Sequence, residues 1–169
     1  MNLARRKFLH FGAAILLCAS WPAISAENSS SIIGTWQLTS AAMLTLDTNE
    51  TSYPYGEHPT GYLQYSPGGH MVAFLASTDM KQPASSIYTD AERVEIHKAI
   101  LAAYSGTYRV EGGMVIHHVL ASWWPHFVGT DQIRYFEIKG NKLTIRAAPQ
   151  KFPETGKDIV FFVSFERVE

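Results

Sequence analysis

The stretch that decides the fold is residues 104–138, which read YSGTYRVEGGMVIHHVLASWWPHFVGTDQIRYFEI. Apolar residues recur at every second position, and a Glu-Gly-Gly turn at 111–113 separates two runs that share one alternation. Side chains of a β-strand point alternately to its two faces. The period of two therefore predicts antiparallel strands joined by a hairpin, with His117 and Arg134 on their apolar faces.

These two polar side chains are the first functional signal. His117 shares its face with Tyr108 and Val119, and Arg134 shares its face with Phe136. A guanidinium among apolar groups is costly unless it meets a counter-ion, a ligand or enclosed water. We therefore expect a closed barrel with a polar spot in its lumen, which indicates a ligand-binding pocket.

The rest of the chain extends the same pattern. A first strand begins at Gly34, and Ser66-Pro67-Gly68-Gly69 predicts a hairpin. Further strands are expected at 104–110, 114–122, 130–138, 142–147 and 158–168. A capping box that begins at Thr89 predicts one helix over 89–103, with Val94, His97, Ile100, Leu101 and Tyr104 on its apolar face.

These elements predict an all-β fold, an eight-stranded antiparallel up-and-down barrel with one short helix between strands. A meander of eight strands can close on itself, which removes its edges and encloses room for one small ligand. A β-sandwich is the competing architecture.

The N-terminus predicts export. Arg5-Arg6-Lys7, an apolar run up to Trp21 and the small residues that follow are typical of a signal peptide over residues 1–26. Cleavage after Ser25 or after Ala26 fits equally well. The paired arginines resemble a twin-arginine signal, but Ala4 stands where that motif has Ser or Thr, so the general secretory route stays open. We expect a periplasmic or secreted protein.

The processed chain is expected to have a disordered lead over 27–32 and one domain over 33–169. Without Arg5, Arg6 and Lys7 the chain keeps 11 basic against 15 acidic residues, a formal charge of −4. A mildly acidic chain without a basic run argues against a nucleic-acid partner, and no stable membrane span is expected after processing. Cys18, the only cysteine, leaves with the signal peptide. The oligomeric state stays open.

Short matching motifs cover almost the whole domain in order. They are GTWxL at 34–38, GYLxYSPxG at 61–69, YSGTYxV at 104–110, HHV at 117–119, PxxVGTDQxRxF at 125–136 and FER at 165–167. In these motifs the chain resembles the bacterial and fungal lipocalin-like domain family. The resemblance implies a calycin-type barrel whose base is closed by Trp36, with Arg167 stacked over the indole ring. Both residues would then be structural, and the family implies no shared activity.

The candidate ligand-binding residues are those expected to face the lumen or its mouth: His117, Arg134, Tyr65, Tyr108, Phe136 and Trp124. Two of them have competing interpretations. His117 could be a core histidine bonded to a tyrosine or a backbone carbonyl. Arg134 could form a salt bridge with Glu137, Glu166 or Asp131.

Two neighbouring segments have open roles as well. The aromatic segment 123–127 could gate a ligand, plug one barrel end or bind a partner. The predicted helix is expected to act as a lid or plug. His118 points away from His117, so the two cannot hold one metal from a single strand.

We predict binding of a small, mostly hydrophobic or amphipathic ligand with a polar or anionic group. The alternative is a cofactor-free isomerase or cyclase, in which neutral His117 moves a proton and Arg134 stabilises an oxyanion. A third possibility is an interaction module that uses segment 123–127. We expect no metal, because the histidines at 58, 70, 97 and 126 lack ligand spacing. No cofactor is expected either, and no nucleophile elbow or phosphate-binding loop occurs.

Overall fold

The computed structural model describes residues 31–79, 81–83, 85–153 and 155–169. The predicted signal peptide, residues 1–26, lies outside them, so cleavage and export remain predictions. Of the predicted disordered lead over 27–32, only Ser31 and Ile32 are described. Ile32 is fully buried, and its carbonyl accepts a hydrogen bond of 2.8 Å from Trp36 Nε1. The packed domain therefore begins before residue 33.

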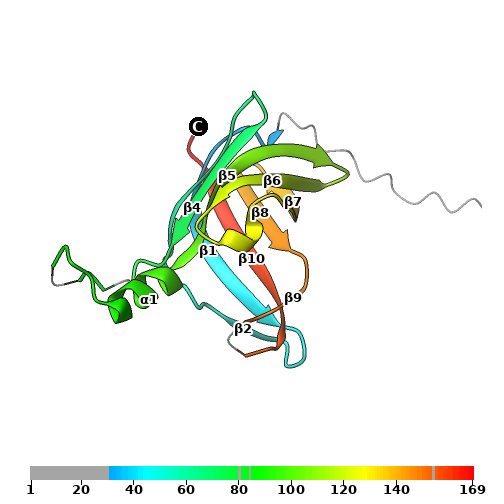
Figure 1. Ribbon diagram of the computed structural model, residues 1–169. Helices are drawn as coiled ribbons and strands as arrows, with labels where there is room; N and C mark the ends of the chain where they lie inside the picture. Colours follow the sequence, from blue (N-terminus) through cyan, green and yellow to red (C-terminus); the bar gives the residue numbers. More distant parts are fainter. Residues whose placement is uncertain (1–30, 80, 84, 154) are drawn as a thin grey trace, which may run out of the picture.

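The described chain is built almost entirely from strands (Figure 1). In chain order the elements are β1 (Gly34–Thr45), β2 (Glu50–Ser52), β3 (Thr60–Tyr65), β4 (His70–Ala76), α1 (Asp90–Ala99), β5 (Ile100–Glu111), β6 (Met114–Ser122), the 3-10 helix η2 (Pro125–Phe127), β7 (Asp131–Lys139), β8 (Lys142–Ala147), β9 (Gln150–Lys151) and β10 (Asp158–Arg167). The strand positions predicted from the alternation are confirmed to within a few residues.

Eight of these strands close into an antiparallel barrel. Neighbours pair in the order β1-β3-β4-β5-β6-β7-β8-β10, and β10 returns to β1, with Trp36 opposite Arg167 at one end of that pair and Thr45 opposite Ile159 at the other. The short strands β2 and β9 flank β1 and β10 beyond the barrel wall (Figure 1). The predicted eight-stranded barrel is confirmed, and a sandwich is excluded because the first and last strands pair.

The two ends of the barrel differ. At the base, Trp36 is fully buried, with Arg167 over its ring. Inward side chains from all around the barrel pack above it; they include Leu38, Leu63, Tyr65, Met71, Val115, Phe136, Leu143 and Phe165. At the opposite end, which we call the mouth, lie α1, the segment 123–127 and β9, all of which contribute to the lining of one cavity. The core thus fills the base and leaves the mouth end for a cavity.

The helix is shorter than predicted. Its capping box is confirmed, because the Glu92 amide donates to the Thr89 hydroxyl and the Glu92 carboxylate accepts from the Thr89 amide. The helix ends at Ala99, and the prediction that it continues to 103 is wrong. From Ile100 onward the backbone pairs with β4, so its polar groups find partners in the sheet instead.

The predicted apolar helix face is also wrong. No residue of α1 is buried, and the side chain of Val94 is 51% exposed. Leu101 and Tyr104, which helical spacing assigned to this face, belong to β5 and point into the barrel instead. The helix projects from the barrel wall beside the mouth (Figure 1).

A close approach between β5 and β6 shapes the wall beside His117. A Cβ atom at Gly106 would lie 1.9 Å from the His118 carbonyl oxygen, so only glycine fits there. The register of the two strands shifts between Ser105 and Gly106, which leaves one extra residue, Leu120, on β6. Because this β-bulge absorbs Leu120, Val119 stays opposite Gly106 and Ser122 stays opposite Tyr104.

Candidate functional site

A cavity of about 350 Å³ opens at the mouth of the barrel. Its inner part is lined by residues of the barrel strands, among them Leu63, Ala73, Leu101, Tyr104, His117, Arg134, Ile145, Val163 and Phe165. Its outer part is lined by Tyr55, His97, Lys98, Trp123, Trp124, Phe127, Gln150, Lys151, Phe152 and Phe161. The walls are therefore mostly apolar, with a few polar groups at defined places, as in small-molecule sites.

His117 lies at the inner end of this cavity and is held by two tyrosines. The Tyr65 hydroxyl is 2.7 Å from Nε2, and the Tyr104 hydroxyl is 2.8 Å from Nδ1. The three residues come from β3, β5 and β6, so the barrel brings together side chains far apart in the chain. His117 is 1% exposed, and both of its ring nitrogens are occupied within the protein.

The ring of His117 is neutral at physiological pH. Burial lowers its pKa to about 3, and the positive charge of Arg134 acts in the same direction. Burial also raises the pKa of Tyr65 and of Tyr104, although Arg134 opposes this effect at both hydroxyls. The group thus consists of an uncharged imidazole and two protonated phenols next to a permanent cation.

Arg134 is the charged group of the inner cavity. Its guanidinium donates to the backbone carbonyl of Ile133 at 2.9 Å and to the Gln132 side-chain oxygen at 3.2 Å. Both acceptors are neutral, and none of the ion pairs among the described residues includes Arg134. A guanidinium has five donors in a planar fork that matches a carboxylate, so Arg134 keeps capacity for an anion.

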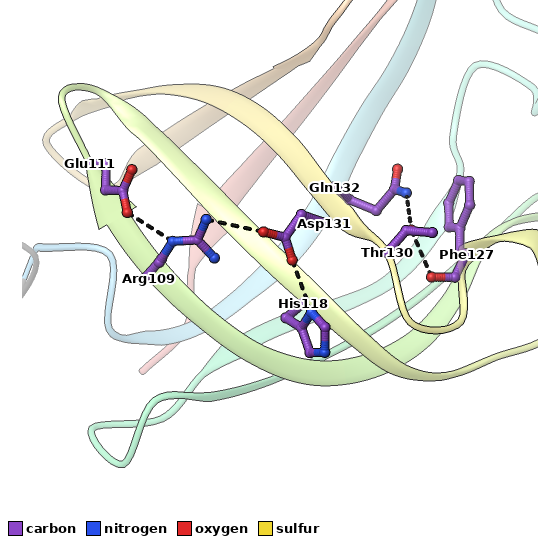
Figure 2. A network of polar contacts seen from close by, with 7 residues as sticks. All are labelled: Arg109, Glu111, His118, Phe127, Thr130, Asp131 and Gln132. Atoms are coloured by element: carbon purple, nitrogen blue, oxygen red, sulfur yellow. Dashed lines mark hydrogen bonds and ion pairs between the residues drawn. The ribbon is translucent and has the colours of Figure 1, made fainter.

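A short hydrogen-bonded path connects Arg134 with the mouth, and Figure 2 shows its part from Gln132 to Phe127. Gln132, whose oxygen accepts from Arg134, donates through its amide nitrogen to the Thr130 hydroxyl at 2.8 Å. The Thr130 hydroxyl donates in turn to the Phe127 carbonyl at 2.8 Å. The position of Arg134 is therefore coupled to the segment that forms one side of the mouth.

Positive charge gathers around the cavity. Besides Arg134, the lining contains Lys98 and Lys151, which pair with Glu95 at 3.2 Å and with Asp158 at 2.8 Å. Among the described lining residues there is no aspartate or glutamate. The electrostatic potential in the cavity therefore favours an anion over a cation. Arg134 carries the positive charge that no carboxylate of the described residues neutralises.

Aromatic rings form much of the mouth. Trp123 packs against His97 of α1 with ring centroids 4.0 Å apart, and Trp124 stacks on Phe127 at 6.2 Å. Trp124 lines the cavity and is also 36% exposed, so its ring contacts both the cavity and the solvent. The segment 123–127 thus does not fill the barrel end. It forms part of the cavity wall at the mouth.

The structure brings three of the six candidate ligand residues to the cavity: His117, Arg134 and Trp124. Tyr65 lies directly behind them as a partner of His117. Tyr108 and Phe136 are elsewhere. The hydroxyl of Tyr108 donates to the Ser66 carbonyl at 2.9 Å near the base, and Phe136 packs in the core. Neither lines the cavity.

Sequence reasoning missed several cavity residues. Helical spacing places Tyr104 on the helix face, and the strand predicted over 104–110 also begins with it. Its place two residues before Gly106 on the alternation of that strand could have indicated the lumen. Leu101 was missed for the same reason. Tyr55 and Phe152 come from loops, and Phe161 comes from β10. Their rings pack together, although they are far apart in the chain, because the barrel closes.

The opposite face of the same strands carries a separate polar network (Figure 2). Asp131 accepts from His118 Nδ1 at 2.9 Å and from Arg109 at 3.0 Å, and Arg109 also donates to Glu111 at 2.8 Å. The His118 and Arg109 contacts lower the pKa of the Asp131 carboxyl. The prediction that His118 faces away from His117 is confirmed. Asp131, expected as one possible partner of Arg134, is engaged on this outer face.

The described residues also show two features that bear on function. No three His, Cys, Asp or Glu side chains in this part of the chain converge as metal ligands would. None of its helices has both the length and the apolarity that crossing a membrane requires.

The fold and the cavity together define a calycin-type barrel with an internal cavity. The family model of the lipocalin-like domain matches residues 33–168, so the chain belongs to that family. A comparison with curated proteins found no significant match. Membership of this family supports ligand binding in general. The class of ligand can be inferred only from the side chains that line the cavity.

Proposed function

We propose that this protein binds a small amphipathic anion, with the apolar part between the aromatic walls and the anionic group at Arg134. The single observation that carries the proposal is a guanidinium in the cavity wall whose hydrogen-bond acceptors are all neutral. A ligand carboxylate would supply the missing counter-charge in a two-pronged geometry.

The size and composition of the cavity support this ligand class. A volume of about 350 Å³ is at the lower end of the range for small-molecule sites, which suits a short aliphatic or single-ring compound. Apolar contacts would supply most of the affinity, at about 25 cal/mol per Å² buried before the costs of ordering the ligand. The export predicted for residues 1–26 would place this binding in the periplasm or outside the cell.

The alternative function, an isomerase or cyclase with His117 as the proton shuttle, has less support. Both ring nitrogens are bonded to tyrosines, and a pKa of about 3 makes the ring a weak base near neutral pH. The third possibility, an interaction module built on segment 123–127, is weakened because Trp123, Trp124 and Phe127 line the cavity.

Calorimetric titration of three ligands with the same tail tests the proposal: decanoate, decanol and decyltrimethylammonium. Wild-type protein should bind decanoate most tightly. Arg134→Gln should weaken decanoate binding about tenfold or more and decanol binding only slightly, because only the acid loses a charge-assisted bond. Arg109→Gln, which removes an arginine from the outer face, is the matched control and should change neither.

Two results would contradict the proposal. The first is an equal loss for acid and alcohol in Arg134→Gln, which would indicate general damage to the cavity. The second is a wild-type protein that prefers the ammonium compound, which would mean that the charge of the cavity has been misread.

A further inference from the structure

The three residues Tyr65, His117 and Tyr104 hold a definite number of protons. A neutral imidazole has one N–H and one bare nitrogen, so one tyrosine must donate to the ring and the other must accept from it. The two hydrogen bonds use two of the three mobile protons. The third proton stays on one hydroxyl and needs an acceptor elsewhere.

The surroundings of the two hydroxyls differ. Tyr65 is 1% exposed and does not line the cavity, and its hydroxyl has no second partner among the described residues. If the spare proton were on Tyr65, it would be a buried donor without an acceptor, which is an unfavourable state. Tyr104 lines the cavity, so a spare proton there can reach a ligand or solvent.

The favoured arrangement therefore has a direction. Tyr65 donates to Nε2, the N–H at Nδ1 donates to the Tyr104 oxygen, and the Tyr104 hydroxyl donates into the cavity. Arg134 lines the same cavity, and its positive charge lowers the pKa of the Tyr104 hydroxyl against the effect of burial. Tyr104 and Arg134 are then neighbouring donors at the inner end of the cavity.

We propose that Tyr104 and Arg134 form a two-donor head-group site that selects carboxylates, and that His117 is a positioning residue which turns the Tyr104 proton toward the ligand. This inference rests on the proposed function and names the recognition of its anionic group. A carboxylate offers one oxygen to each donor. An alcohol offers a single oxygen and brings no negative charge to the two donors.

The tautomer of His117 tests the arrangement without any ligand. Long-range proton–nitrogen NMR of the ¹⁵N-histidine-labelled protein distinguishes Nδ1–H from Nε2–H, and the His117 signal is the one missing from His117→Gln. The Nδ1–H form is expected. Observation of the Nε2–H form would overturn the inference, since the spare proton would then be on Tyr65.

The ratio of decanoate to decanol affinity tests the recognition. Tyr104→Phe should lower this ratio about tenfold, because the acid loses a hydrogen bond to a charged group. Tyr65→Phe leaves the cavity lining intact but frees the His117 ring to change tautomer. It should therefore lower the ratio about threefold, which is less than the effect of Tyr104→Phe. Tyr62→Phe, on the exposed face of the same strand, is the control and should keep the wild-type ratio.

The outcomes separate the two proposals. An unchanged ratio in Tyr104→Phe would overturn the head-group site even if Arg134 is needed for decanoate. A wild-type protein that binds no decanoate would overturn the proposed function and its head-group site, whereas the tautomer would still show whether the proton order is right. A parallel loss of both ligands in Tyr65→Phe would assign that residue a merely structural role.

Discussion

The guanidinium of Arg167 lies over the indole ring of Trp36, with its central carbon 4.0 Å from the ring centroid. The two residues are directly opposite each other in the pairing of β1 with β10, the contact that closes the barrel. Arg167 also donates to the carbonyls of Ser31 and Ile33, and Trp36 donates to the carbonyl of Ile32. One cation–π pair thus joins the first strand, the last strand and the segment before β1.

Arg167→Ala should lower the free energy of unfolding by about 2 kcal/mol, because it removes the cation–π contact and two hydrogen bonds. Urea unfolding followed by circular dichroism measures this change. Arg146→Ala is the control, since its guanidinium lies 4.3 Å over the ring of Tyr135 on the barrel exterior. That exposed pair should contribute about 0.5 kcal/mol. Equal losses would mean that the base contact is not specially stabilising.

His117 should make the protein less stable in mild acid. Its pKa is about 3 in the folded protein and about 6.5 when unfolded, so between these values only the unfolded chain takes up the proton. Its contribution to stability is full above about pH 6.5. It falls as the pH decreases toward 3, by up to about 1.4 kcal/mol per pH unit.

Urea midpoints measured from pH 7 to pH 4 check this expectation. His117→Gln should be less stable at neutral pH, because a hydrogen-bonded side chain is replaced, but its stability should change less steeply with pH. The same slope in both proteins would show that His117 is not buried in a neutral form.

Gln132 should matter for ligand binding although it does not line the cavity. Its side-chain oxygen accepts from Arg134 and its amide nitrogen donates to Thr130, so Gln132→Ala frees the guanidinium to move. Decanoate affinity should fall about threefold to tenfold with little loss of stability. Asp131→Asn, one residue earlier on the opposite face, breaks the outer network and should keep wild-type affinity. Comparable losses from both would mean that β7 as a whole has been disturbed.

Ligand chain length should report the depth of the apolar cavity. For a series from hexanoate to tetradecanoate, affinity should rise by up to about fourfold per methylene and then level off once the tail reaches solvent. Fluorescence of Trp123 and Trp124 offers the measurement, because both indoles line the cavity whereas Trp36 is at the base. A double variant with Phe at both positions should lose most of the signal. Affinity independent of chain length would contradict a tail buried in the barrel.

Local patterns predicted much of this protein correctly. The facing of His117, His118 and Arg134 follows from the two-residue period of a strand, which depends only on the chain's own geometry. The start of α1 at the Thr89 capping box is equally local. The pairing of Trp36 with Arg167 came from the family resemblance, since sequence alone does not reveal which strands meet.

Alternation indicates the face of a strand but not the height along the barrel. Tyr108 and Phe136 point inward as predicted, yet they pack below the cavity, while Tyr104 on the same alternation reaches it. The end of α1 was misjudged because helical spacing continues to Tyr104. The helix ends at Ala99 because the backbone from Ile100 onward pairs with strand β4.

The sequence by itself determined where the strands lie, which side chains face inward and that a cation is among them, because these properties are set by residues close together in the chain. Only the tertiary structure decided that Tyr65 and Tyr104 occupy both nitrogens of His117 and that neutral oxygens hold Arg134. These contacts depend on how eight strands are staggered when the barrel closes, and that stagger depends on pairing between residues distant in the chain.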